Sequence, residues 1–213
     1  MSRKKKTYFI NIPNINKNNL QISNVGEYSM TPPKDAKKLC KIIKKYFDKN
    51  ITITDTTANN GGNTIAFALE FNSVNAVEIE KKEYDILVNN INVYKLKNVK
   101  TYNNDYLKVL EKLEQDIIFI DPPWGGKEYK KENNLQLYLS NKNLFEIIDL
   151  LKNKCQSIIC KVPFNYCFNK LFEKYKKIKK IHLYKFKKYV IFILIDKRND
   201  NVLIEDYLSK NIY

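Results

Sequence analysis

Four short apolar runs in the first part of the chain each end at, or just before, an acidic side chain: Asp55, Glu78, Asp105 and Asp121. Segments with helical spacing separate these runs, so strands and helices are predicted to alternate along the chain. Such alternation is typical of a doubly wound α/β fold, in which ligands bind at the carboxyl ends of the parallel strands. The four acids are therefore expected at one ligand-binding edge of the sheet.

The remaining elements follow the same pattern and end in a hairpin. Strands are predicted at 51–54, 74–79, 99–102, 117–120, 157–162, 178–186 and 189–195, and helices at 63–71, 81–94, 106–113, 144–151 and 166–176. Another helix is predicted after Thr31, which is expected to be its N-cap, with Pro32 in the first helical position. We interpret residues 1–28 as an N-terminal extension and 29–213 as one domain.

Composition narrows the partners that the protein can have. The formal net charge is +15, which favours a polyanion, either nucleic acid or an acidic membrane surface. No apolar run reaches the roughly 20 residues that span a bilayer, and no apolar core follows the basic cluster at 3–6, so an intracellular protein is predicted. The four cysteines and the single histidine, His182, lack the spacing of a zinc site, so no metal is expected.

The turn from Asp121 to Gly126 carries the most specific chemistry. Pro122 and Pro123 end the preceding strand because neither can donate to the sheet, and the only tryptophan, Trp124, follows them. A carboxylate and a proline carbonyl can accept the hydrogens of an exocyclic base amine, which frees its lone pair for attack. An aromatic ring beside them can stack on the base, so the turn is predicted to be catalytic. The alternative is a structural turn with a core tryptophan.

The loop after the first strand has the character of a cofactor loop. It runs from Asp55 through Gly61 to Thr64 and leads into a helix, an arrangement that presents backbone N–H groups to a ligand. Glu78 ends the second strand, where an acid can hold a ribose diol. Four of the five glycines lie in this loop and in the catalytic turn, where the backbone is expected to approach a ligand.

These motifs resemble the trimethylguanosine synthase family, the RNA cap guanine-N2 methyltransferases. The resemblance extends from about residue 26 to residue 195, and its most specific part is the Pro-Pro-Trp-Gly-Gly turn followed by Tyr129. The Ser-Met-Thr-Pro segment before the first helix, the Gly-Gly-Asn-Thr loop and Asn89-Asn90 also match, although these are common to many methyltransferases. The resemblance implies a class I methyltransferase with a mostly parallel seven-stranded sheet and a C-terminal antiparallel hairpin.

The resemblance also implies a role for each candidate residue. S-adenosylmethionine would be held by the first part of the chain, through Thr31, Asp55, Gly61, Asn63, Thr64, Glu78 and Asp105. A 7-methylguanosine cap would stack on Trp124, and Asp121 with the Pro122 carbonyl would hold its N2 amine. Other cap contacts are expected from Gly125, Tyr129, Lys161 and Asn165. The product would be a 2,7-dimethyl or 2,2,7-trimethyl cap, made by a monomer in the nucleus or cytoplasm, or in a virus factory if the chain is viral.

Two departures keep other functions open. Asn59 stands where the family usually has a glycine, and Phe164 where it usually has an arginine. One alternative is an adenine-N6 methyltransferase of RNA or DNA, because such enzymes also use an Asp-Pro-Pro-Trp turn. Another is an RNA-binding domain of the same fold that has lost its cofactor, for which Asn59 is the only support.

Overall fold

The computed structural model describes residues 8–126, 128–177 and 179–196. The basic cluster at 3–6, Lys127 and the end of the predicted domain at 197–213 lie outside these ranges. The chain forms two compact units, residues 1–116 and 117–213. The structure contains a mostly parallel seven-stranded sheet with helices, so the predicted fold class is confirmed.

The first unit is a parallel βαβαβ arrangement with strand order β3-β2-β1. Its strands are β1 (Thr52–Asp55), β2 (Ser73–Glu78) and β3 (Val99–Asn103), connected by α3 (Gly62–Glu70) and α4 (Lys81–Val93). Strand β2 is almost entirely buried, which explains its apolar run. The parallel pairing puts the ends of β1, β2 and β3 at one edge, as the positions of their acids predicted.

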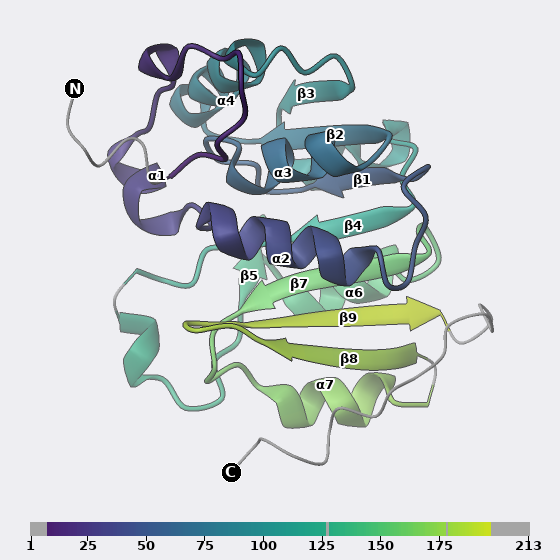
Figure 1. Cartoon of the computed structure of the whole chain (residues 1–213). Coiled ribbons are helices and arrows are strands. Elements are labelled where there is room, and N and C mark those ends of the chain that lie inside the picture. The colour runs from purple at the N-terminus through teal and green to yellow at the C-terminus, as the bar shows by residue number, and fades with distance from the viewer. Residues whose placement is uncertain (1–7, 127, 178, 197–213) are drawn as a thin grey trace. The chain divides into compact units, whose positions relative to one another are not determined.

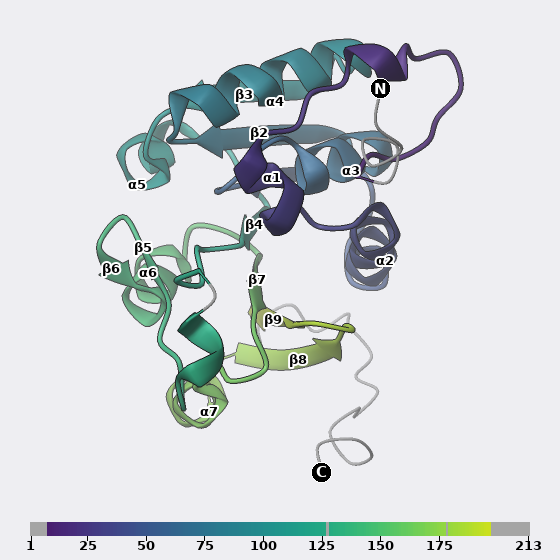
Figure 2. The same ribbon diagram turned by 90° about the vertical axis from the view of Figure 1, so that its left-hand side faces the viewer.

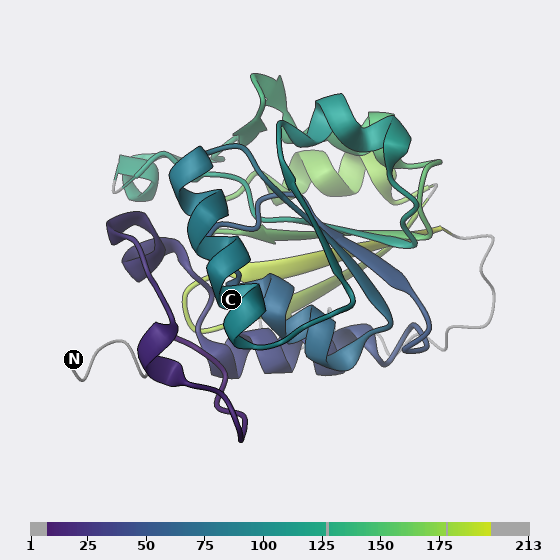
Figure 3. The ribbon, with the colours of Figure 1, turned by 90° about the horizontal axis from the view of Figure 1, so that it is seen from above.

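The first long helix, α2 (Pro33–Ile43), packs beside α3 on one face of this sheet (Figures 1 and 3). The prediction that Thr31 caps it is wrong by one position, because Pro32 is the N-cap and Pro33 the first helical residue. A residue that precedes proline is sterically excluded from helical geometry, and Pro32 accordingly has an extended ψ of 143°. The side chain of Thr31 is thereby available for another contact, with Asn63.

Residues 8–29 belong to the first unit and pack onto its core. They contain a 3-10 turn, η2 (Lys17–Asn19), and a helix, α1 (Asn24–Ser29), that sequence reasoning missed. Phe9 and Leu20 are buried in a cluster with Met30, and η2 lies against α4 (Figure 2). The domain limits of 1–28 and 29–213 stay a prediction. The unit ends with α5 (Tyr106–Val109) and η3 (Leu110–Lys112).

The second unit has strand order β4-β7-β9-β8. Strands β4 (Ile117–Ile120) and β7 (Ser157–Val162) are parallel, while β8 (Lys179–Lys185) and β9 (Val190–Asp196) form the predicted antiparallel hairpin (Figure 1). Helices α6 (Leu144–Leu151) and α7 (Phe168–Tyr175) complete it. The stretch from 128 to 143 contains η4 (Glu128–Lys131) and a small hairpin of β5 (Tyr138–Leu139) and β6 (Lys142–Asn143).

No helix in the described ranges is long and apolar enough to cross a membrane.

Candidate active site

The loop after β1 is held by hydrogen bonds to Asp55, the acidic residue at the end of that strand. Asp55 is buried, its Oδ2 accepts a hydrogen bond of 2.7 Å from the hydroxyl of Thr64, and its Oδ1 accepts a longer one of 3.4 Å from the N–H of Thr57. Thr64 lies in the first turn of α3, so this contact fixes where the helix begins relative to the strand. The structure thus brings two of the predicted cofactor residues into direct contact.

Glu78 closes the same loop from the end of β2. Its carboxylate accepts hydrogen bonds from the N–H of Asn59 at 2.7 Å and of Glu80 at 2.9 Å. Burial raises the pKa of Glu78, and the two N–H donors oppose that rise. A carboxylate has about four lone-pair positions, so two remain to accept a pair of hydroxyl groups. The geometry therefore suits a ribose diol.

Asn59, which departs from the family pattern, occupies a left-handed backbone conformation with φ of +47°. Asparagine tolerates this conformation better than most residues, and its Oδ1 also accepts from the N–H of Asn60. Gly61, two positions on, has φ of +95°, so a glycine is needed there for backbone reasons. The asparagine substitution is thus compatible with an intact loop.

The loop presents fewer backbone donors than the sequence suggested. The N–H groups of Ala58 and Gly61 donate to Val77 and Ala58 carbonyls, and those of Asn59 and Asn60 have the acceptors described above. These bonds stiffen the loop.

Two buried polar atoms of this region fit the expected cofactor. The Oδ1 of Asn63 and the Oγ1 of Thr56 have no hydrogen-bond partner among the described residues. The Nδ2 of Asn63 donates to the hydroxyl of Thr31 at 3.1 Å, so its amide is oriented. Buried polar atoms in proteins almost always have a partner, and a polar ligand such as the methionine part of S-adenosylmethionine would supply one.

A buried network behind the loop was missed by sequence reasoning. The carboxylate of Glu83 accepts from the hydroxyl of Ser23 at 2.6 Å and from the side chain of Asn60. The side chain of Asn90 donates to the Asn60 carbonyl and pairs with both backbone groups of Gln21. These residues are far apart in sequence, and only Asn90 carried a signal, as part of the Asn-Asn match. The network ties the N-terminal segment and α4 to the loop.

Asp105, expected to hold the adenine amine, is the N-cap of α5. Its Oδ1 accepts from the N–H of Leu107 at 2.9 Å. One carboxylate oxygen thus has a structural task, while a role for the other in binding adenine stays a prediction.

The turn after β4, which the sequence predicts to be catalytic, forms an ion pair with β7. Asp121 follows β4, and its Oδ2 is 2.7 Å from the Nζ of Lys161, which belongs to β7. The two side chains are only 17% and 7% exposed. Burial raises the pKa of Asp121, and the Lys161 ammonium opposes this rise. The resemblance suggested that Lys161 contacts the cap. In the structure its ammonium group forms an ion pair with Asp121, the proposed catalytic acid.

Trp124 lies in an aromatic cluster around the same lysine. Its ring is 5.2 Å from that of Tyr129 in an edge-on arrangement and 6.4 Å from that of Tyr189. The Nζ of Lys161 is 5.6 Å from the centre of the Trp124 ring and 4.9 Å from that of Tyr189. Tyr189, which stacks on Phe186 at the β8–β9 turn, gave no signal in the sequence. Lys161 therefore connects the acid to the aromatic platform.

The two glycines of the turn are explained by their backbone conformation, because no neighbouring atom lies close enough to exclude a side chain. Gly125 and Gly126 have φ of +88° and +69°, and an added Cβ would meet nothing within 4 Å at either position. Asn165, expected to touch the cap, instead donates from Nδ2 to the carbonyls of Tyr129 and Glu132, at 2.6 and 2.8 Å. It thus anchors the segment that follows the turn.

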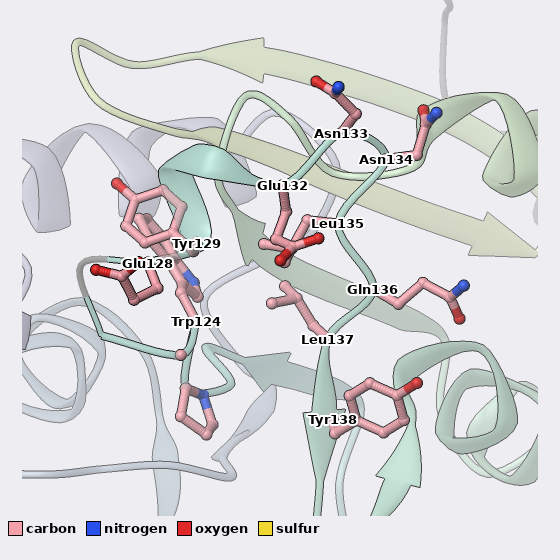
Figure 4. A pocket seen from close by; sticks show the side chains of 12 residues that line it. Trp124, Glu128, Tyr129, Glu132, Asn133, Asn134, Leu135, Gln136, Leu137 and Tyr138 are labelled. Carbon is pink, nitrogen blue, oxygen red and sulfur yellow. The ribbon is translucent and has the colours of Figure 1, made fainter.

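A pocket of about 660 Å³ lies between the turn and this segment. Figure 4 shows Trp124 and Tyr129 on one side of the pocket, with Leu137 and Glu132 on the other. Pro123 and Gly125 also line the pocket, whereas Asp121 does not. The described residues contain no group of three or more histidine, cysteine, aspartate or glutamate side chains that could hold a metal ion.

Comparison with known proteins agrees with this picture. A family model described as RNA cap guanine-N2 methyltransferase matches residues 50–204. An uncharacterized protein of Acanthamoeba polyphaga mimivirus is 40% identical over 60% of this chain and 52% of its own length. Trimethylguanosine synthase of Saccharomyces cerevisiae is 25% identical over 71% of this chain and 50% of its own. The chain thus spans about half the length of these relatives.

Ribosomal RNA methyltransferases are also similar. Ribosomal RNA small subunit methyltransferase D of Buchnera aphidicola is 30% identical over 79% of this chain and 88% of its own length. A Streptococcus mutans structure described as a methyltransferase in complex with SAH has a TM-score of 0.56 at 12% identity, and covers 78% of this chain and 99% of that one. The fold is therefore that of class I methyltransferases, and S-adenosylmethionine is the cofactor. This chain belongs to the RNA cap guanine-N2 methyltransferase family.

Proposed function

We propose that the protein transfers a methyl group from S-adenosylmethionine to the exocyclic N2 of a 7-methylguanosine RNA cap. The observation that carries this proposal is the turn after β4, where a buried carboxylate is followed by a proline carbonyl and a tryptophan that lines a pocket. The family model supports the same reaction. Because the chain spans only about half the length of these relatives, the identity of the natural RNA and the number of methyl groups transferred are also proposals.

The two units would divide the work. In the first, Glu78 would accept the ribose hydroxyls, and Asn63 with Thr31 would meet the methionine part of the cofactor. In the second, Trp124 would stack on the guanine, while Asp121 and the Pro122 carbonyl accept the N2 hydrogens. Asp105 remains the proposed contact for adenine. The cofactor supplies the methyl group and the positive sulfur that activates it.

Catalysis by these residues is mainly a matter of position. The amine lone pair is delocalised into the guanine ring, and two acceptors placed in advance turn it toward the methyl carbon. The amine must then lie in line with the methyl–sulfur bond at near-attack distance. The new C–N bond forms as the C–S bond breaks, and the proton that the amine loses becomes acidic in that step. Asp121 can receive this proton when its carboxyl group is ionised, because it already accepts the hydrogen bond.

A substrate panel tests the proposal. Purified protein with labelled S-adenosylmethionine should methylate 7-methyl-GTP and 7-methyl-capped RNA, and mass spectrometry should place the methyl groups on N2. The panel also contains GTP, an unmethylated cap, adenine oligonucleotides and a ribosomal RNA fragment. Methylation of adenine alone would establish the adenine-N6 alternative, and no transfer to any substrate would support the RNA-binding alternative.

A ribosomal substrate is the second candidate. The similarity to Ribosomal RNA small subunit methyltransferase D, which covers most of both chains, is the observation that favours it. Transfer to the ribosomal fragment without transfer to capped RNA would decide for this candidate.

Replacing Glu78 with glutamine should weaken S-adenosylmethionine binding by roughly 10–100-fold, because hydrogen bonds to a charged group contribute about 1.5–3 kcal/mol. Calorimetry measures the affinity, and thermal protection by the cofactor should fall in parallel. Glu70→Gln is the control, since Glu70 forms a surface pair with Lys44 on the outside of the unit. Unchanged cofactor affinity in Glu78→Gln would remove Glu78 from the site.

A further inference from the structure

The charge of the pocket beside Trp124 contrasts with that of the whole protein. The chain has 38 basic and 23 acidic side chains, yet the described lining residues include two glutamates, Glu128 and Glu132, and neither lysine nor arginine. A lining of this kind disfavours phosphate groups. It favours a flat ring that is neutral or positively charged.

The two glutamates are not equivalent. Glu128 forms an ion pair with Lys131 one turn later, which neutralises its charge locally. The carboxylate of Glu132 has no hydrogen-bond or ion-pair partner among the described residues, and Glu132 lines the same pocket as Trp124 and Tyr129, on the side where Leu137 lies (Figure 4). Glu132 is therefore the side chain that gives the pocket its negative charge.

The wall that carries Glu132 is anchored. The Nδ2 of Asn165 donates to the Glu132 carbonyl at 2.8 Å, and the N–H of Leu135 donates to the Asn165 carbonyl at 2.8 Å. Leu137, further along the same wall, is only 2% exposed and its carbonyl accepts from the N–H of Leu144. The carboxylate is thus held on a fixed backbone opposite the aromatic pair.

Trp124 is poorly placed to recognise a cation unaided. The Lys161 ammonium already lies 5.6 Å from the centre of its ring, and although Asp121 partly balances that charge, a second cation on the ring would still be repelled by it. Stacking by Trp124 remains favourable for any base. Discrimination between a neutral and a positively charged base then needs a separate negative group.

We propose that Glu132 is a specificity-determining residue, whose carboxylate makes the pocket select a cationic 7-methylated guanine over an unmethylated one. The inference rests on the proposed function and assigns a different task to each side of the pocket. Trp124 contributes affinity for the base, whatever its charge, and Glu132 contributes the preference for the positive charge.

The test compares 7-methyl-GTP and GTP by calorimetry. In Glu132→Gln the affinity for 7-methyl-GTP should fall by about 2–5-fold, as expected for an exposed charge pair, while the affinity for GTP stays constant or rises. In Trp124→Phe both affinities should fall while most of the preference remains. Glu173→Gln, which removes an exposed charge from α7 in the same unit, should change neither.

The outcomes separate this inference from the proposed function. Glu132→Gln should fold normally because its carboxylate has no described partner, and an unchanged melting temperature checks this. If wild-type protein prefers 7-methyl-GTP and Glu132→Gln keeps that preference, the role of Glu132 is overturned while the function stands. If wild-type protein binds and methylates neither nucleotide nor capped RNA, the proposed function fails, and the inference fails with it.

Discussion

Replacing Asp121 with alanine should lower turnover by about 10²–10³-fold, the usual cost of removing one preorganised group from a site. Asp121 would accept a hydrogen of the attacking amine, and it is the only carboxylate within the turn from residue 121 to residue 126. Turnover is measured at saturating S-adenosylmethionine and 7-methyl-GTP. Cofactor affinity should remain nearly unchanged, because the cofactor contacts proposed above belong to the first unit.

The control for this result concerns stability. Removing Asp121 leaves the Lys161 ammonium buried without its partner, and breaking one side of a buried pair typically costs about 3–5 kcal/mol. The double variant Asp121→Asn with Lys161→Met removes both charges, so it should recover much of the melting temperature without recovering turnover. Turnover near the wild-type value in either variant would exclude Asp121 from catalysis.

Replacing Lys161 with methionine should move the acid limb of the pH–activity profile upward by about 1–3 pH units, the usual influence of an opposite charge at this distance. Asp121 must be ionised to accept the amine hydrogens. Burial raises its pKa, and Lys161 holds that rise in check, so the pKa climbs further when the ammonium is lost. The other titratable neighbour is the Cys160 thiol, whose own pKa burial raises well above the ordinary value, so it stays neutral.

The direction of this effect is distinctive. A carboxyl whose pKa is raised on folding binds its proton more tightly in the native state, so its contribution to stability is present at low pH and is lost as pH rises through the native pKa. Lys161→Met should accordingly be most destabilised above the shifted pKa, while its activity recovers there. The pH–activity profiles of Lys161→Met and of the wild type are measured on the same substrate, so that any ionisation of the substrate base affects both profiles equally. Parallel loss of activity at every pH would instead indicate a purely structural role.

Sequence reasoning succeeded where the signal is local. The strands, the terminal hairpin and the turn after β4 follow from short apolar runs and from prolines that cannot continue a strand. It failed where neighbouring signals compete. The helix α1 lies in a polar stretch without clear periodicity, and the start of α2 was misplaced because two prolines follow each other and only the second can be helical.

The sequence by itself determined the α/β class, the position of the acids at strand ends and the family resemblance, because each depends on residues within a few positions of one another. Only the tertiary structure decided which partners these residues have. Lys161 meets Asp121 across 40 positions, and Ser23 meets Glu83 across 60. Such contacts depend on how strands and helices pack, and no local periodicity records them. For the same reason only the folded chain shows that Glu132 and Trp124 line one pocket.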